Sequence, residues 1–184
     1  MPQINILPKH IAELIAAGEV VERPASIVKE IMENAIDAGA DKITLEIKRG
    51  GITYIRITDN GCGIDRDNIR KAFISHATSK ISTADDLNAI CTLGFRGEAL
   101  ASIAAVSRVE VMTRGENEDV GTRYCIEGGE ETVLDDAGCP KGTTLIVRDL
   151  FYNTPARMKF LKKDVSEGNA VAAVVDRIAL SHPE

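Results

Sequence analysis

This 184-residue chain is organised around the stretch Lys29-Glu30-Ile31-Met32-Glu33-Asn34-Ala35-Ile36-Asp37-Ala38-Gly39. The stretch predicts the second half of a helix that begins near Pro24, because proline suits a first helical position and glycine favours a helix end. With about 100° between successive residues, the apolar and polar side chains separate onto opposite arcs of this helix. The apolar arc contains Ile27, Val28, Ile31, Met32, Ala35 and Ile36, and the polar arc contains Glu30, Glu33, Asn34 and Asp37.

Part of the polar arc is a stripe at positions i, i+4 and i+7, formed by Glu30, Asn34 and Asp37. A solvated acidic face is the ordinary interpretation of such a stripe. However, asparagine has a poor propensity for a helix interior, and carboxylates on both sides of it repel each other unless a cation lies between them. Mg²⁺ would explain both features, because it takes oxygen ligands and keeps several waters. Helix geometry alone leaves both interpretations open.

Composition limits the class of protein. The formal net charge of −6 argues against a simple basic domain that coats nucleic acid, but it leaves room for a local basic patch. The four cysteines, Cys62, Cys91, Cys125 and Cys139, are widely spaced, so we expect reduced thiols and neither a zinc site nor a disulfide framework. No apolar run reaches membrane-spanning length, and the N-terminus lacks a signal-peptide pattern. We therefore expect a soluble intracellular protein.

The remaining segments predict alternating helices and strands. A short helix is expected from Pro8 to Ala17, ended by Gly18. Alternating apolar and polar residues predict a half-buried strand at 43–47, a hairpin turn at Gly50-Gly51 and a returning strand at 52–58. Further helices are expected at 66–75, 85–90, 98–105 and 166–182, and further strands at 108–113, 122–126, 131–134 and 143–149. The helix at 166–182 looks buried, which suggests that a further domain follows it.

Two glycine-containing segments are candidate ligand sites. Asp59-Asn60-Gly61-Cys62-Gly63-Ile64 follows a predicted strand, and its glycines allow close approach of a ligand to the backbone, although such turns are common. Gly94-Phe95-Arg96-Gly97 precedes a predicted helix, an arrangement that suits a phosphate. Its spacing matches neither the P-loop nor the dinucleotide fingerprint. An ordinary mobile loop fits this second segment equally well.

Taken jointly, the motifs resemble the N-terminal ATPase domain of the MutL family of DNA mismatch-repair proteins, over nearly the whole chain. Glu30-x-x-x-Asn34 with Asp59-x-Gly61-x-Gly63 alone would indicate only the wider ATPase superfamily of type II topoisomerases, histidine kinases and a heat-shock chaperone. Two segments narrow the resemblance to MutL. These are Gly94-Phe95-Arg96-Gly97-Glu98-Ala99-Leu100 and Phe151-Tyr152-Asn153-Thr154-Pro155-Ala156-Arg157, supported by the segments at 18–24 and 76–80.

The resemblance implies ATP and Mg²⁺ as cofactors and gives each motif a role. Glu30 would be the general base that deprotonates the attacking water, and Asn34 would bind Mg²⁺ through its side-chain oxygen. Asp59 would accept a hydrogen bond from the adenine amino group. Gly63 would give the base room, and Gly61 would also belong to the nucleotide site. A threonine would support the contact with the base. Thr143 fits the usual Gly-Thr pattern, and Thr144 stays open as the alternative. For Asp37, a structural hydrogen bond and a water-mediated nucleotide contact stay open.

Residues 76–100 would form a lid over the phosphates, as the resemblance implies. The lid residues expected near the phosphates are Thr78, Ser79, Lys80, Gly94, Phe95, Arg96, Gly97, Glu98, Ala99 and Leu100. Arg96 is alternatively an anchor for the lid through an ion pair. A phosphate-contacting lysine from a following domain would complete the site. We therefore expect 1–184 to be an N-terminal ATPase domain that ends before a second, transducer-like domain and hydrolyses ATP weakly by itself.

The expected fold is an α/β (α+β) two-layer sandwich, with a mixed, largely antiparallel sheet covered by helices on one face. The resemblance implies self-association on ATP binding, a mismatch-recognition partner of the MutS type, and DNA contact through the full-length protein. It implies an intracellular location, cytoplasmic or nucleoid-associated in a bacterium and nuclear in a eukaryote, without membrane contact. The basic cluster Arg157, Lys159, Lys162 and Lys163 is interpreted as a solvated linker in preference to a DNA contact.

Two other functions compete with an ATP-hydrolysing switch. The first is a nucleotide-binding module with negligible turnover. The second is a phosphotransferase of the histidine-kinase type, which needs a dimerisation helix with an acceptor histidine before the Asn34 helix. The residues that precede Glu30 leave little room for such a helix. A purely DNA-binding role is the weakest alternative, because no groove-reading motif is recognisable.

Overall fold

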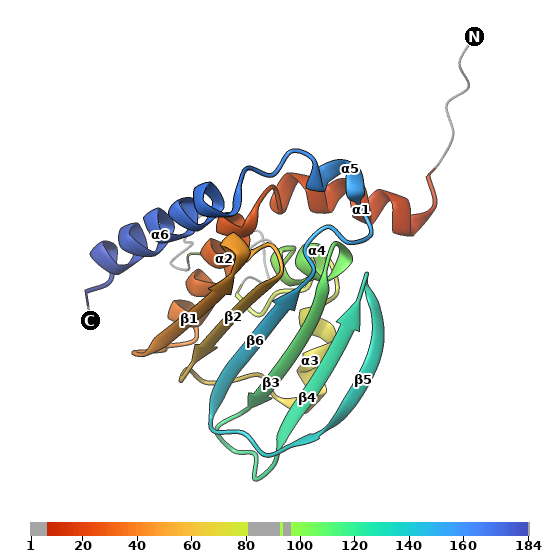
Figure 1. Ribbon diagram of the computed structural model, residues 1–184. Helices are drawn as coiled ribbons and strands as arrows, with labels where there is room; N and C mark the ends of the chain where they lie inside the picture. Colours follow the sequence, from red (N-terminus) through yellow and green to blue (C-terminus); the bar gives the residue numbers. More distant parts are fainter. Residues whose placement is uncertain (1–6, 81–92, 94–96, 184) are drawn as a thin grey trace.

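The computed structural model describes residues 7–80, 93 and 97–183, and it shows a six-stranded sheet with helices on one face (Figure 1). The strands are β1 (Ile43–Lys48), β2 (Tyr54–Asp59), β3 (Arg108–Arg114), β4 (Gly121–Glu127), β5 (Glu130–Ala137) and β6 (Gly142–Arg148). The helices are α1 (Lys9–Val20), α2 (Pro24–Asp37), α3 (Arg66–Ala72), α4 (Ala99–Ala105), α5 (Pro155–Met158) and α6 (Asp164–Ser181), with a 3₁₀ turn η1 at Arg49–Gly51. The two-layer α/β fold expected from the sequence is confirmed.

The sheet has the strand order β1-β2-β6-β3-β4-β5, and every strand pair in the described part of the chain is antiparallel. The long connection between β2 and β3 carries α3 and α4, and β6 then returns to the middle of the sheet. This order brings the C-terminal end of β2 beside the beginning of β6. Asp59 pairs with Thr143, and Thr143 pairs in turn with Thr113 on β3. Three segments that are distant in the sequence therefore meet at one end of the sheet.

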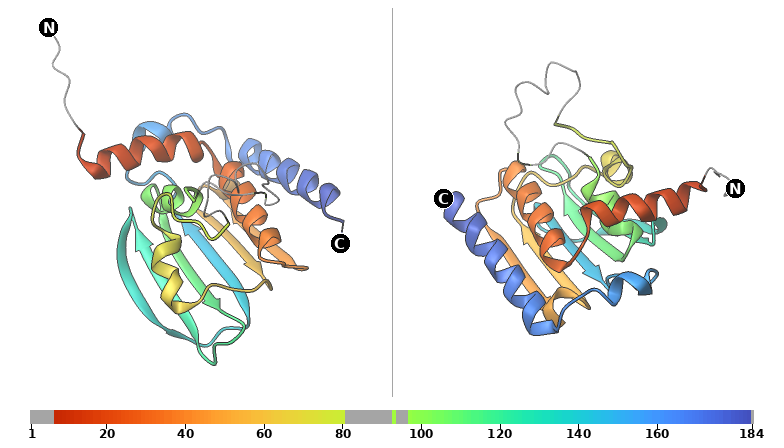
Figure 2. Two further views of the ribbon diagram at one scale, coloured as in Figure 1. Left: turned by 180° about the vertical axis from the view of Figure 1, so that it is seen from behind. Right: turned by 90° about the horizontal axis from the view of Figure 1, so that it is seen from above.

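Helix α2 packs its apolar arc against the sheet. It begins at Pro24 as expected, and Ile27, Val28 and Ile31 are at most 5% exposed. These side chains share one hydrophobic core with Ile55 and Ile57 of β2 and with Val109 and Val111 of β3, among others. Figure 2, left, shows α2, α3 and α4 on the side of the sheet that Figure 1 turns away from the viewer. Because the apolar arc faces the sheet, the polar arc with Glu30 and Asn34 is turned away from it.

Helix α6 packs along α2 and the η1 turn, and it is less buried than expected from its apolar residues. Only Glu167 and Val171 are buried in it, whereas Val165 and Leu180 are mostly exposed. The buried Glu167 carboxylate accepts hydrogen bonds from Nε of Arg23 at 2.9 Å and from the backbone N–H of Lys162 at 2.9 Å. The helix predicted at 166–182 is therefore present, but the prediction that it is buried was wrong, because only one side of it packs against the rest of the protein.

Two further sequence predictions need correction. Helix α1 does not end at Gly18 but continues to Val20. The guanidinium of Arg157, which donates to the backbone oxygen of Leu14, lies where a Cβ atom on Gly18 would be. Gly50-Gly51 belongs to a 3₁₀ turn rather than to a two-residue hairpin, and β2 begins only at Tyr54. The helix predicted at 85–90 lies outside the described residues.

The described helices include none that is long and apolar enough to cross a membrane. The opposite face of the sheet carries a hollow of about 350 Å³ lined by Thr44, Glu46, Arg56 and Thr58. These residues alternate along β1 and β2 with those that face the core. This hollow therefore lies on the other side of the sheet from the polar arc of α2.

Candidate functional site

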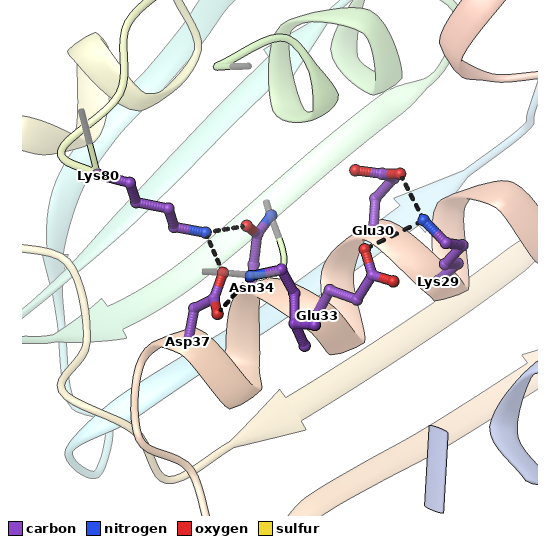
Figure 3. A network of polar contacts seen from close by, with 7 residues as sticks. Lys29, Glu30, Glu33, Asn34, Asp37 and Lys80 are labelled. Atoms are coloured by element: carbon purple, nitrogen blue, oxygen red, sulfur yellow. Dashed lines mark hydrogen bonds and ion pairs between the residues drawn. The ribbon is translucent and has the colours of Figure 1, made fainter. Parts of the chain in front are cut away.

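The polar arc of α2 is the first part of the candidate site. At one end of it, the Glu30 and Glu33 carboxylates contact the neighbouring Lys29. The Lys29 ammonium lies 3.3 Å from Oε1 of Glu30 and 3.1 Å from Oε2 of Glu33 (Figure 3). Partial burial lowers the pKa of Lys29, but the hydrogen bond to Glu33 and the charge of Glu30 raise it by more, so the net shift is upward. A positive charge therefore lies between the two carboxylates, one of which is the predicted general base.

The other end of the arc holds a second positive charge. Nζ of Lys80 donates hydrogen bonds to Oδ1 of Asn34 at 3.0 Å and to Oδ2 of Asp37 at 2.5 Å, and Figure 3 shows all three side chains converging. The Asp37 carboxylate is only 8% exposed and also accepts the backbone N–H of Leu93 at 3.1 Å. The stripe predicted from the sequence is therefore not simply a solvated acidic face, because the Lys80 ammonium contacts oxygen atoms of Asn34 and Asp37.

The loop after β2 supplies the second half of the site. Oδ1 of Asp59 accepts backbone N–H groups from Gly61 at 2.9 Å and from Thr143 at 3.3 Å. Burial raises the pKa of the Asp59 carboxyl above its usual value, although these two hydrogen bonds oppose the shift. Within the described ranges no hydrogen bond reaches Oδ2. The carboxyl group is thus anchored through one oxygen and offers the other as an acceptor.

Close backbone contacts join this loop to α2 and to β3. The N–H of Cys62 donates to the backbone oxygen of Ala38 at 2.9 Å, and a Cβ atom on Gly61 would lie 2.8 Å from the same oxygen. Gly63 has a φ of 73°, and a Cβ atom on it would overlap the backbone oxygen of Arg114. Both glycines are therefore required for close approach, which keeps Asp59 near the C-terminal end of α2.

The sheet register separates the two threonines that the sequence left as alternatives. Thr143 is directly opposite Asp59, so its side chain lies on the same face of the sheet. Thr144 lies on the other face, where its hydroxyl is 3.1 Å from that of Thr58. Of the two candidates, only Thr143 is brought together with Asp59, and Thr144 does not belong to this cluster.

The two ends of the predicted lid are held together. The N–H of His76 donates to the backbone oxygen of Gly97 at 2.9 Å, and Gly97 has a φ of 64° and packs against the backbone of Ala77. Thr78 accepts the backbone N–H of Lys80 at 3.1 Å, and Ser79 is exposed. Glu98 precedes α4, which begins with Ala99 and Leu100. Gly94, Phe95 and Arg96 lie outside the described residues, so the lid itself stays a prediction.

The chemistry of the polar arc fits a hard cation together with phosphates. Asn34 and Asp37 present oxygen atoms, and the ammonium of Lys80 already occupies a place beside them. No group of three or more His, Cys, Asp or Glu side chains able to hold a metal exists among the described residues. Mg²⁺ in proteins usually shares its coordination among one or two side chains, substrate phosphates and water.

Sequence reasoning missed three features of the site. The position of Lys29 between Glu30 and Glu33 was visible only as an i,i+4 pair, a common surface pattern. The ion pair of Lys80 with Asp37 joins residues 43 positions apart and carries no local signal. Thr113, a fully buried threonine on β3, contacts the site through its hydroxyl but belongs to no motif.

Comparison with known proteins identifies the fold and the domain. The family model described as histidine kinase-, DNA gyrase B- and HSP90-like ATPase matches residues 22–128. The MutL ATPase domain of Aquifex aeolicus in complex with ADP superposes with a TM-score of 0.73 and 34% sequence identity, covering 89% of this chain and 57% of that one. A second structure, the ATPase domain of the Aquifex aeolicus mismatch repair endonuclease MutL, gives a TM-score of 0.71 and 33% identity over 89% of this chain and 55% of that one.

Curated relatives match over the whole chain. The DNA mismatch repair protein MutL of Agathobacter rectalis is 59% identical over 184 residues, which is 100% of this chain and 28% of that protein. The MutL protein of Caldanaerobacter subterraneus is 56% identical over 183 residues and is covered to 31%. The chain thus spans less than a third of the length of these relatives. It belongs to the histidine kinase-, DNA gyrase B- and HSP90-like ATPase family, and within it to the MutL DNA mismatch-repair proteins.

Proposed function

We propose that residues 1–184 bind and hydrolyse ATP as the ATPase domain of a DNA mismatch-repair protein. The observation that supports this most directly is the cation beside Asn34 and Asp37, where the Lys80 ammonium is held by two oxygen atoms of α2. A site that holds one cation between oxygen ligands suits a metal ion together with the phosphates it neutralises. The ADP named with the Aquifex aeolicus relative supports the same assignment.

In this proposal the nucleotide lies between α2 and the loop after β2. The adenine amino group donates to the Oδ2 atom of Asp59, because Oδ1 is already occupied by two backbone N–H groups. Gly61 and Gly63 leave room for the base by their close packing on Ala38 and Arg114. The phosphates extend toward Lys80 and the beginning of α4.

Asn34 is the side chain that would hold Mg²⁺, and the ion would supply positive charge to the phosphate oxygens. Glu30 would accept a proton from the attacking water, in the role of a general base. Lys29, paired with both Glu30 and Glu33, would orient the Glu30 carboxylate. Lys80 would move from Asp37 to a phosphate oxygen when nucleotide arrives, because both partners are anionic oxygens.

The wider roles of the protein are proposals by analogy with its relatives. ATP binding would favour association of two such domains and would pass a mismatch signal from a protein of the MutS type to later repair factors. DNA contact would belong to the full-length protein, and the protein would act inside the cell. A lysine from a following domain would complete the phosphate site, so we expect residues 1–184 alone to turn over ATP slowly.

The test is the exchange Glu30→Ala, followed by ATP binding and single-turnover phosphate release at saturating Mg-ATP. Loss of a general base typically slows a reaction by about 10²- to 10⁴-fold, whereas binding should change little. The control is Glu46→Ala, which removes an exposed carboxylate from the other face of the sheet. Release by Glu30→Ala within a few-fold of the unmodified chain would exclude Glu30 as the base. Nucleotide binding without measurable release by the unmodified chain would favour a nucleotide-binding module with negligible turnover.

A further inference from the structure

A buried hydroxyl joins the separate parts of the Asp59 cluster. Thr113, in β3, is 0% exposed, and its Oγ1 atom lies close to three polar groups. These are the N–H of Ile64 at 2.8 Å, the backbone oxygen of Gly142 at 3.0 Å and Oγ1 of Thr143 at 3.1 Å. The first group belongs to the glycine loop after β2, and the other two belong to the beginning of β6. One oxygen atom therefore ties the loop to the strand that carries Thr143.

The donors and acceptors around this hydroxyl determine the direction of each hydrogen bond. The hydroxyl of Thr113 has one proton to donate, the N–H of Ile64 can only donate, and the carbonyl of Gly142 can only accept. All groups are satisfied when Thr113 donates to Gly142 and accepts from both Ile64 and Thr143. The proton of Thr143 is then committed to Thr113. The Thr143 oxygen can therefore only accept from a ligand.

The direction of the hydrogen bond between Thr143 and Thr113 affects which nucleobase the site can bind. Thr143 and Asp59 lie opposite each other on the same face, and Oδ1 of Asp59 takes the backbone N–H of Thr143. The free Asp59 oxygen is an acceptor, and the Thr143 oxygen becomes a second one. Two acceptors suit the amino group at position 6 of adenine and disfavour the keto oxygen at position 6 of guanine, because two facing acceptors repel each other.

We propose that Thr113 is a positioning residue that makes this site selective for adenine over guanine nucleotides, by fixing the glycine loop against β6 and by holding Thr143 as an acceptor. The inference rests on the proposed nucleotide-binding function. Removal of the hydroxyl should not detach the loop, because Gly63 remains packed against the backbone of Arg114 and Cys62 remains bonded to Ala38. The effect should therefore appear in nucleotide binding rather than in loss of the fold.

The experiment compares three variants by isothermal titration with ADP and with GDP. Thr113→Val, which keeps the shape and removes the hydroxyl, should bind ADP about tenfold more weakly, equivalent to about 1.4 kcal/mol, and its preference for ADP over GDP should fall by a similar factor. Thr113→Ser should restore both values to within about twofold, since it keeps the hydroxyl.

The matched control is Thr122→Val. Thr122 is 1% exposed and pairs directly with Thr113 on the neighbouring strand, and the described residues show no hydrogen bond to its side chain. This control should bind ADP and GDP as the unmodified chain does. A purely structural role for Thr113 would lower the melting temperature without changing the ratio of the two affinities.

Unchanged ADP affinity and nucleotide preference in Thr113→Val would overturn the inference and leave the proposed function intact. Lack of ADP binding by the unmodified chain would overturn both. If Thr113→Val does not fold, the same titrations on Thr113→Cys decide the question, because a thiol fills similar space with a weaker donor. Weaker ADP binding and a reduced preference are expected there, and values equal to those of the unmodified chain would count against the role of the hydroxyl.

Discussion

The substitution Asp59→Asn separates the roles of the two carboxylate oxygen atoms. The side-chain oxygen of the introduced asparagine must stay on the side of the Gly61 and Thr143 N–H groups, because both donate to Oδ1 of Asp59 in the native protein. The new NH₂ group then occupies the place of Oδ2 and points its protons toward the amino group of adenine. An acceptor becomes a donor with almost no change of shape, so the variant tests hydrogen-bond chemistry and not packing.

The size of the effect follows from the kind of bond that is lost. A hydrogen bond to a charged group contributes about 1.5–3 kcal/mol, which corresponds to about a 10- to 150-fold loss of affinity. ADP binding in the presence of a chelator isolates this contribution from that of any metal at Asn34. The preference for ADP over GDP should also fall, since the new NH₂ group can donate to a keto oxygen. Asn34→Ala should bind ADP normally under the same conditions.

The same variant should be at least as stable as the native chain at neutral pH. Burial raises the pKa of Asp59 above its usual value of 3.8, despite the opposing hydrogen bonds from Gly61 and Thr143. A carboxyl group whose pKa is higher in the folded state favours folding most when protonated, and this contribution is lost as the pH rises from 3.8 through the folded pKa. The neutral asparagine avoids that loss.

Two measurements decide this prediction. Calorimetric titration with ADP gives the affinity, and thermal unfolding at pH 7 and near pH 5 gives the stability. A variant that binds ADP within about twofold of the native affinity would contradict the assignment of Asp59 to the base, since loss of even a weak charge-assisted bond exceeds that factor. A lower melting temperature at pH 7 than at pH 5, relative to the native chain, would contradict the sign of the pKa argument.

Two further substitutions test other contacts of the structure. Lys80→Met should weaken ATP binding by about tenfold or more, as expected for loss of a charge-assisted contact. It should leave adenosine binding unchanged, because adenosine has no phosphates. Equal losses of affinity for both ligands would contradict a contact between Lys80 and a phosphate. Glu167→Ala should lower the free energy of unfolding by about 2–4 kcal/mol in urea titrations, because it leaves Arg23 and the N–H of Lys162 without their buried partner. Glu46→Ala, which removes an exposed ion pair, should cost less than about 1 kcal/mol, and an equal cost for both would show that burial of Glu167 is unimportant.

The parts of the fold with a strong local period were predicted well. Helix α2 begins at Pro24 as expected, and the strands were placed within a few residues of their observed ends. The predicted ends of helices and strands were wrong where contacts with distant parts of the chain determine the local structure. Gly18 was interpreted as a helix end, although it makes room for Arg157, which comes from a segment far along the chain. Likewise, β2 begins only after η1, a turn that packs against α6.

The candidate site was predictable residue by residue but not as an arrangement. The sequence indicated Glu30, Asn34 and Asp59. It favoured Thr143 but left Thr144 open, because the choice depends on the register of β6 against β2. The contact of Lys80 with Asn34 joins residues on different elements and leaves no trace in local spacing. Thr113 was missed for the same reason, since a threonine in a strand is ordinary until its partners are known.

Nucleotide binding between α2 and the loop after β2 is tested most directly by an NMR titration of the ¹⁵N-labelled chain with ADP and Mg²⁺. Backbone amide signals on both halves of the site should shift together, namely those of Asn34, Gly61, Gly63 and Thr143. The hollow on the opposite face of the sheet supplies an internal control, lined by Thr44, Glu46, Arg56 and Thr58, whose signals should stay in place. Shifts confined to that hollow, or no shifts at millimolar ADP, would contradict nucleotide binding between α2 and the loop after β2.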